Sequence, residues 1–270
     1  MSSLFVSLNL DLILKMIMEH SPGCIIDETR KKCIKDAIKT KNLAFLRILS
    51  QTVDPFINTC EYLKFAVGIE DNIHVIEYLL SLNCPIDQLK VLISAVEKKA
   101  FNNLKFLHVK KRFAIDDNYR VFSSAAGAED NIEILEYLKS HNCSTGHLTT
   151  SISIAENGAL NNLKWLLNNG FSMEDEYIFD TAIGSGSLDV LKWLKRNKCP
   201  IDKGTIYPLS LENCSIETLE WLEKEGFRIN PQCVFRGAAR NGCLDKMKWM
   251  LKKNNSIKDS RIIRAAAEHG

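Results

Sequence analysis

Residues 188–202 read LDVLKWLKRNKCPID, and three other stretches of the chain repeat this pattern. They are LNNLKWLLNNGF at 160–171, IETLEWLEKEGF at 216–227 and LDKMKWMLKK at 244–253. The four tryptophans are therefore evenly spaced along the chain. A fixed period of this kind, here about 28 residues, is the signature of a repeat protein, in which each repeat is one supersecondary motif that packs on its neighbours.

The same register continues towards the N-terminus with other apolar residues at the tryptophan position. Successive positions are separated by about 28 to 31 residues, within the range of known repeat families. Each lies within a stripe of apolar residues at helical spacing, so we predict that it is buried and holds the stack of repeats together. We call these eight residues the anchors: Ile48, Tyr78, Phe106, Tyr137, Trp165, Trp193, Trp221 and Trp249.

Each repeat reads as two helices joined by a short turn. Small residues at a fixed interval before the anchor, such as Ala182 before Trp193, indicate a first helix that approaches its neighbours closely. Gly or Asn follows, as at Asn241-Gly242, and can adopt the positive φ that ends a helix. The anchor lies on the second helix, and breakers such as Cys199-Pro200 return the chain to the next repeat.

Composition and charge agree with a folded helical protein. The 270 residues are 46% hydrophobic and 25% charged, with 13 Gly and 6 Pro. The net charge of +2 is nearly balanced and its signs are interleaved, so neither nucleic acid nor a membrane is a favoured partner. No apolar run is long enough to span a bilayer. None of the 9 Cys forms a C-x-x-C pair, and we expect a cytoplasmic protein in a reducing compartment.

The segment AARNGCLDKMKWM at 238–250 resembles the helical part of an ankyrin repeat, A-A-x-x-G-x-L-x-x-(V/L)-x-x-L. A standard ankyrin repeat has about 33 residues, whereas these have about 28 and lack the G-x-T-P-L-H motif of the β-hairpin. The short repeat ending in K-W-L-x-x-N-x-C-P is similar to the ankyrin proteins of giant DNA viruses of amoebae. The resemblance implies an all-α, ankyrin-like helical repeat solenoid with short or absent β-hairpins, and a viral protein of the host cytoplasm.

The two ends of the chain depart from the repeat. Residues 1–29 read as an amphipathic capping helix, Leu4 to Met18, followed by a degenerate repeat in which Cys24-Ile25-Ile26-Asp27 forms a connection. We expect eight ankyrin-like repeats over residues 30–261 and the first helix of a further, incomplete repeat at 262–270. Either the array continues or a partner covers its last apolar face.

No reactive constellation accompanies the repeat. The loop Gly184-Ser185-Gly186-Ser187 has neither the preceding strand nor the following Lys of a phosphate-binding loop. His141, Cys143 and His147 match no zinc pattern. We therefore predict no catalytic residue, no cofactor and no metal.

Cysteine and phenylalanine share one position of the repeat, six residues after the anchor. Since free Cys behaves as a small hydrophobe, this sharing predicts a buried apolar site. The residues concerned are Cys84, Cys143, Phe171, Cys199 and Phe227.

The ankyrin resemblance also implies where a partner would bind, namely at the ends of the first helices and the loops before them, on a concave face. Carboxylates of repeats two to five make that edge acidic, so a protein partner with a basic segment would fit. Solvated helix ends are the alternative interpretation. The partner-binding residues so assigned are Glu70, Asp71, Glu97, Lys98, Glu129, Asp130, Glu156, Asn157 and Arg240. Tyr177 and Tyr207, in loops near the starts of first helices, are added because Tyr is enriched at interfaces.

The sequence thus favours a non-catalytic protein–protein interaction scaffold or adaptor. A structural spacer or virion component without a dedicated partner is the alternative, and the sequence does not separate these two classes. An enzyme is the least favoured class. The oligomeric state is left open.

Overall fold

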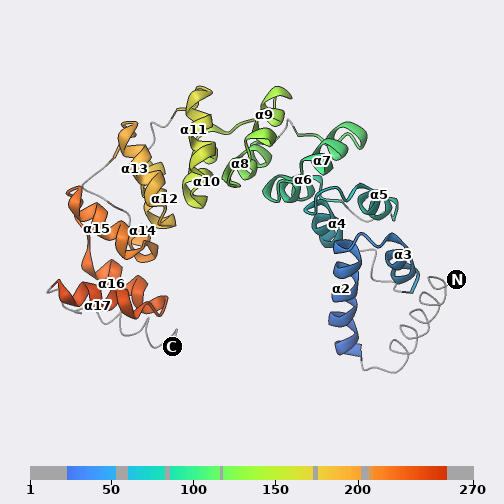
Figure 1. Cartoon of the computed structure of the whole chain (residues 1–270), viewed down its shortest axis with the longest axis horizontal. Coiled ribbons are helices and arrows are strands. Elements are labelled where there is room, and N and C mark those ends of the chain that lie inside the picture. Colours follow the sequence, from blue (N-terminus) through green and yellow to red (C-terminus); the bar gives the residue numbers. More distant parts are fainter. Residues whose placement is uncertain are drawn as a thin grey trace. The chain divides into compact units, whose positions relative to one another are not determined.

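The computed structural model describes residues 23–52, 60–82, 86–115, 118–172, 176–201, 206 and 208–253. All regular elements of these residues are helices, and no strand occurs among them (Figure 1). The all-α class predicted from the helical periodicity is therefore confirmed.

The chain divides into two compact units, Met1–Ala114 and Ile115–Gly270. The helices of the first unit are α2 (Gly23–Lys39), α3 (Leu43–Thr52), α4 (Cys60–Val67), α5 (Ile73–Ser81), α6 (Gln88–Glu97), α7 (Phe101–Lys105) and the π-helix η2 (Phe106–Lys110). Those of the second are α8 (Tyr119–Gly127), α9 (Ile132–Ser140), α10 (His147–Asn157), α11 (Leu160–Asn168), α12 (Glu176–Ser185), α13 (Leu188–Arg196), α14 (Pro208–Asn213), α15 (Ile216–Lys224), α16 (Pro231–Arg240) and α17 (Leu244–Lys252).

Within each compact unit the helices come in pairs, and the first helices of successive pairs pack on one another. In the first unit α2 packs on α4 and α4 on α6. In the second unit the same holds from α8 through α10, α12 and α14 to α16. The small residues predicted to allow this approach are buried, with Ala95, Ala126, Ala182 and Ala238 fully inaccessible to solvent.

In the described pairs other than α14–α15, a residue with positive φ, seven residues before the anchor, makes the turn between the two helices. Gly158, Gly186 and Gly242 have φ of 70°, 71° and 62°. Glycine adopts this conformation without a Cβ clash, so it ends the first helix at no steric cost. Asp71 and Asp130 occupy the same position with φ of 55° and 50°. The predicted positive φ is confirmed at the three glycine turns, whereas Asp or Lys occupies this position in other pairs.

On the second helices the buried residues are mainly the aliphatic ones beside the anchors, and the prediction that the anchors themselves are buried is wrong. The residue after each described anchor, usually Leu, is at most 3% exposed, whereas all eight anchors are only half-buried. The residues two before and one after the anchor are three apart and share one helix face. The anchor is displaced from that face by about 100° and lies on the flank of the stripe.

The longest interval between anchors runs from Phe106 to Tyr137 and begins with a π-helix. In the α10–α11 repeat the Phe171 N–H donates to the Leu166 carbonyl five residues earlier, at 3.1 Å. The corresponding bond after α7 joins Phe113 to Leu107, six residues apart, also at 3.1 Å. One of the three additional residues is therefore absorbed by η2, as is typical of π-helical insertions.

The N-terminal boundary of the repeats differs from the prediction. Cys24 to Asp27 lie within α2, so the predicted connection there is wrong. The pattern C-I-I-D lacks the Pro of C-P-I-D, and without it nothing stops the helix. The predicted capping helix Leu4 to Met18 and the incomplete repeat at 262–270 lie outside the described residues.

Candidate interaction surfaces

Two buried asparagines tie the end of the first helix α4 to the second helix of the same pair, α5, and to the second helix of the next pair, α7. The Asn103 side-chain amide donates to the carbonyls of Val67 at 2.9 Å and Ile69 at 2.6 Å, and its oxygen accepts the Asn72 N–H at 3.2 Å. Asn72 in turn donates to the Ala66 carbonyl at 3.0 Å. These bonds satisfy carbonyls that a helix C-terminus leaves unpaired.

The second compact unit contains the same arrangement, atom for atom. Asn162 donates to the carbonyls of Ala126 at 2.8 Å and Ala128 at 2.6 Å and accepts the Asn131 N–H at 3.1 Å. Both asparagines are at most 3% exposed. Their role was not predicted from the sequence. A signal was available, because Asn103 and Asn162 occupy a phase of the repeat that carries the apolar residues Val75, Ile134 and Val190 in other repeats.

In the last described repeat, Lys246 takes the place of the asparagine. It is 5% exposed, and its ammonium donates to the Glu212 carbonyl at 3.2 Å. A Cβ on Gly237 would lie 2.2 Å from that same oxygen, so α16 approaches the end of α14 more closely than any side chain would permit. Backbone contact and a charged donor together fix α16–α17 on α14.

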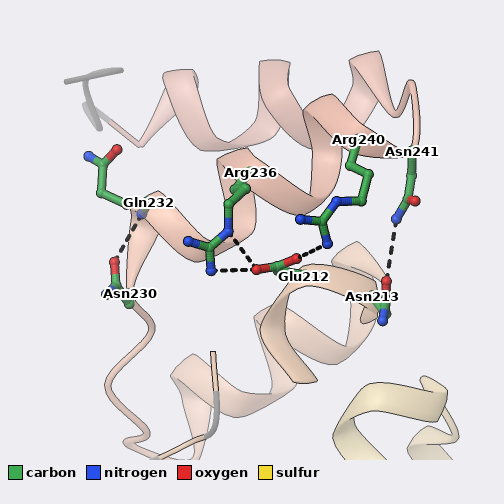
Figure 2. A network of polar contacts seen from close by, with 7 residues as sticks. All are labelled: Glu212, Asn213, Asn230, Gln232, Arg236, Arg240 and Asn241. Carbon is green, nitrogen blue, oxygen red and sulfur yellow. Dashed lines mark hydrogen bonds and ion pairs between the residues drawn. The ribbon is translucent and has the colours of Figure 1, made fainter. Parts of the chain in front are cut away.

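Glu212 itself is the centre of a buried ion cluster (Figure 2). Its side chain is 2% exposed and lies between two arginines of α16. The Arg236 Nε donates to Oε1 at 2.6 Å, and the Arg240 Nη1 donates to Oε2 at 2.8 Å. Beside it, Asn241 donates to Asn213 at 3.4 Å. Arg240, which we predicted to contact a partner, is instead paired within the protein, although 45% of its side chain remains exposed.

Cys214 follows α14 and is fully buried. Burial raises the pKa of its thiol to about 11, although the Lys246 ammonium opposes this shift. A thiol with a raised pKa is a poor nucleophile, because the thiolate is the reactive form. Cys143 and Cys199 are also buried, as are Phe171 and Phe227, which confirms the apolar site predicted six residues after the anchor. Cys84 lies outside the described residues.

Three of the acidic residues assigned to partner binding make contacts between repeats instead. Glu70 accepts the backbone N–H of Asn102 at 3.0 Å, in the first turn of α7. The Asn102 side chain donates to Asp71 at 2.7 Å, and Asn161 donates to Asp130 in the same way. Glu70 thus satisfies a backbone N–H at the start of the second helix of the next pair, and Asp71 and Asp130 hold side-chain amides at the starts of α7 and α11.

The remaining assigned residues lie at the surface. Glu97, Glu129 and Glu156 are exposed at the ends of the first helices, as are Lys98 and Asn157. Tyr177 is 46% exposed in the first turn of α12. Tyr207 lies outside the described residues.

Lys98 also borders a pocket of the first compact unit. The pocket has a volume of about 330 Å³ and lies along the first helices α2, α4 and α6. Lys35, Lys64 and Lys98 surround it, with Glu61 as the acidic residue among its lining side chains. Basic residues therefore outnumber acidic ones on this part of the predicted partner-binding side.

The second helices carry a further groove in the second compact unit, with a volume of about 490 Å³. It lies between α13 and α15 and contains a half-buried anchor, Trp221. The side chains that line it are Lys192, Lys195, Arg196, Trp221, Lys224 and Glu225. This groove was not predicted from the sequence, because residues of both charge signs precede the anchors, which is typical of a solvated helix face.

Among the described residues, no group of three His, Cys, Asp or Glu side chains is placed to hold a metal ion. The Cys143 thiol donates to the Ile115 carbonyl at 2.7 Å, and His141 packs on the Tyr137 ring. In the same described part of the chain, no helix has the length and apolar character needed to cross a bilayer.

Comparison with known proteins does not assign the chain to a family. No protein-family model matches it, and no curated protein matches its sequence.

Proposed function

We propose that the chain is a non-catalytic, ankyrin-like helical repeat scaffold that binds a protein partner. The observation that carries the proposal is the recurrence of the same contacts between successive repeats. The bonds of Asn72 and Asn103 return at Asn131 and Asn162, at the same phase two repeats further along the chain. Repeats that contact their neighbours in one register form a stack, and such stacks are used mainly as extended binding surfaces.

The packing of first helices on first helices supports the same proposal. It leaves their C-terminal ends at the surface, where Glu97, Glu129 and Glu156 are exposed. None of these three carboxylates has a hydrogen-bonding or ion-pair partner among the described residues. They are therefore available for the basic segment of a partner, whereas Glu70, Asp71 and Asp130 are occupied within the protein.

The resemblance of the short repeat to the ankyrin proteins of giant viruses of amoebae supports a role in the host cytoplasm. The test is capture of partners from an amoebal extract by the tagged full-length chain, with quantification of every captured protein. We expect one partner at fixed stoichiometry. Its yield should fall with salt, because exposed charges are screened beyond about 10 Å at 0.1 M.

Two variants make the experiment specific. Reversal of Glu97, Glu129 and Glu156 to Lys should abolish capture and leave the melting curve nearly unchanged, since exposed charges contribute little to stability. The control reverses Lys164 and Lys248, two exposed residues of the second helices, to Glu. If no protein is captured stoichiometrically, a structural spacer is the better description.

A further inference from the structure

Successive second helices of the second compact unit meet in seams, and each seam contains a tryptophan anchor from the later helix. Between α9 and α11, the Trp165 indole N–H donates to Glu136 at 3.4 Å. Between α15 and α17, the Trp249 indole N–H donates to Glu220 at 2.9 Å. In both seams the Glu immediately precedes the anchor of the earlier helix. The protein itself therefore supplies an acceptor to these two indoles.

The seam between α13 and α15 has the opposite chemistry, because the corresponding residue is Lys192. A lysine ammonium donates and cannot accept. Trp221 packs against Phe179 and Phe227, with ring centroids 6.4 and 6.5 Å apart. No described residue accepts a hydrogen bond from its indole N–H. The ring is thus positioned by the aromatic cluster, while its donor group has no acceptor in the protein.

The groove also contains more cations than carboxylates, which adds to its excess of hydrogen-bond donors over acceptors. Lys195 pairs with Glu225, the acidic residue among the lining side chains. Lys192, Arg196 and Lys224 have no carboxylate partner among the described residues. The C-terminal ends of α13 and α15 favour Arg196 and Lys224 through the helix dipole. This effect does not explain Lys192, which lies in the middle of α13.

The seam between α11 and α13 shares only part of this chemistry. Lys164 stands there in the place of Lys192, next to the anchor Trp193 of the later helix. Leu167 and Asn168, however, occupy the positions that Lys195 and Arg196 hold in the groove. The cluster of cations is therefore specific to the seam between α13 and α15.

We propose that the groove between α13 and α15 binds a short, carboxylate-rich peptide segment. One carboxylate accepts from the Trp221 indole and Lys192, and a second carboxylate binds Arg196 and Lys224. The inference rests on the proposed function, since it names the chemistry of one partner segment. Acceptors on the ligand match a site that offers donors, and its negative charge relieves repulsion between the cations.

Nucleic acid fits this surface less well than a peptide. A polyanion that tracked along α15 would meet the exposed carboxylates of Glu217, Glu220 and Glu223. Binding of nucleic acid depends on many phosphate contacts along a continuous basic track. A segment with a few carboxylates needs only the groove, whose volume is within the usual range of ligand pockets.

The test is an NMR titration of the full-length chain, labelled with ¹⁵N at tryptophan, with acetylated hexaglutamate. The four indole signals are assigned by Trp→Phe substitution. We expect a saturable downfield shift of the Trp221 indole N–H, a smaller shift of Trp193, and unmoved signals of Trp165 and Trp249 because their donors are already occupied. The affinity should fall several-fold between about 0.05 and 0.3 M NaCl. Hexalysine and decathymidylate are titrated in parallel.

Lys192→Glu is the decisive variant, because it installs the acceptor that Glu136 and Glu220 provide in the other seams. In the free protein it should move the Trp221 signal towards those of Trp165 and Trp249. It should also weaken hexaglutamate at least about tenfold, which corresponds to about 1.4 kcal/mol. The matched control is Lys248→Glu, at the same position of α17, which should change the affinity by less than about twofold.

The proposal is overturned if hexaglutamate leaves the Trp221 signal unmoved or shifts all four indoles alike. It is also overturned if decathymidylate binds more tightly than hexaglutamate, or if the two lysine variants weaken the peptide equally. If the wild type and Lys192→Glu capture a partner equally well, the groove does not bind that partner, but the proposed scaffold function is still supported. Absence of any stoichiometric partner contradicts the scaffold function itself, whatever the peptide does.

Discussion

At the residue scale, the difference in burial between Leu194 and Trp193 leads to the first prediction. Leu194 is fully buried, whereas Trp193 lies half-buried on the flank of the helix. Leu194→Ala should lower the free energy of unfolding by about 2–5 kcal/mol through loss of buried surface and formation of a cavity. Trp193→Ala, although it removes more atoms, should cost only about 1–2 kcal/mol because part of the ring is already in water.

Urea denaturation of the two variants measures this difference. Leu167→Ala, an exposed position of α11, is the control and should change stability by less than about 0.5 kcal/mol. A larger loss of unfolding free energy for Trp193→Ala than for Leu194→Ala would show that the anchors belong to the buried core.

The buried thiol of Cys214 leads to a prediction on alkaline stability. Its pKa is raised from 9.0 to about 11, so the folded protein keeps a proton that the unfolded chain loses in this range. The stabilisation is fully present below pH 9 and is lost as the pH rises through about 11, by roughly 2–3 kcal/mol. Urea midpoints measured under reducing conditions should therefore fall more steeply with pH for the wild type than for Cys214→Ala.

Ionisable groups away from Cys214 are common to both proteins, so the difference between the two curves reports Cys214 together with its neighbour Lys246. Parallel curves from pH 8 to 11 would show that the thiol has no raised pKa. Native-state reactivity gives an independent check, since the exposed Cys243 should react with a thiol reagent long before Cys214.

At the scale of the element, the buried asparagines predict that helix pairs are joined by polar bonds that an apolar residue does not replace. Asn162→Leu leaves the carbonyls of Ala126 and Ala128 without their donor. Each unsatisfied buried group costs about 1–3 kcal/mol, so we expect a loss of roughly 2–4 kcal/mol in chemical denaturation. Asn168→Leu, at an exposed position near the end of α11, is the matched control and should be nearly neutral. Equal stability of the two variants would show that these bonds contribute nothing.

Periodicity identified the elements because helix pairs leave a signal in every repeat. Positive φ at Gly158 and burial of Ala238 follow from local chemistry that one repeat already shows. The partial exposure of Trp193 could not be predicted from one repeat, since an apolar residue on the edge of a stripe can face either the core or the neighbouring helix. Which of these holds depends on how repeats stack, and that is a property of two repeats together.

The candidate surfaces were predicted less well for the same reason. Glu212 and Arg240 hold the same phase of successive repeats with opposite charge, so their pairing was accessible from the sequence once neighbours were compared. The hydrogen bonds of Glu70 and Asp71 with Asn102 were not accessible, because acidic residues at helix ends are exposed by default. The groove at Trp221 became visible only when its seam was compared with the others.

At the scale of the whole molecule, a stack of like repeats should tolerate the removal of one repeat without loss of the fold. Deletion of residues 160–187 joins Ala159 to Leu188 and removes α11 and α12. The join is conformationally matched, because Ala159 and Ser187 precede their second helices with φ of −74° and −77° and ψ of 70° and 82°. In a repeat array the stability is roughly the sum of the stabilities of the repeats and of the interfaces between neighbours. Such a deletion removes the contribution of one repeat and one interface and leaves the other repeats folded.

The central claim is therefore tested most directly by far-UV circular dichroism and urea denaturation of two deletion variants. The variant lacking residues 160–187 should keep the helical signal per residue of the wild type and unfold cooperatively at a somewhat lower urea concentration. The variant lacking residues 160–173 places α10 before α12 without a second helix between them, and it should lose helical signal and cooperativity. Equal loss of structure in both variants would show that the repeat defined by the anchors is not the unit of the fold and would contradict the account.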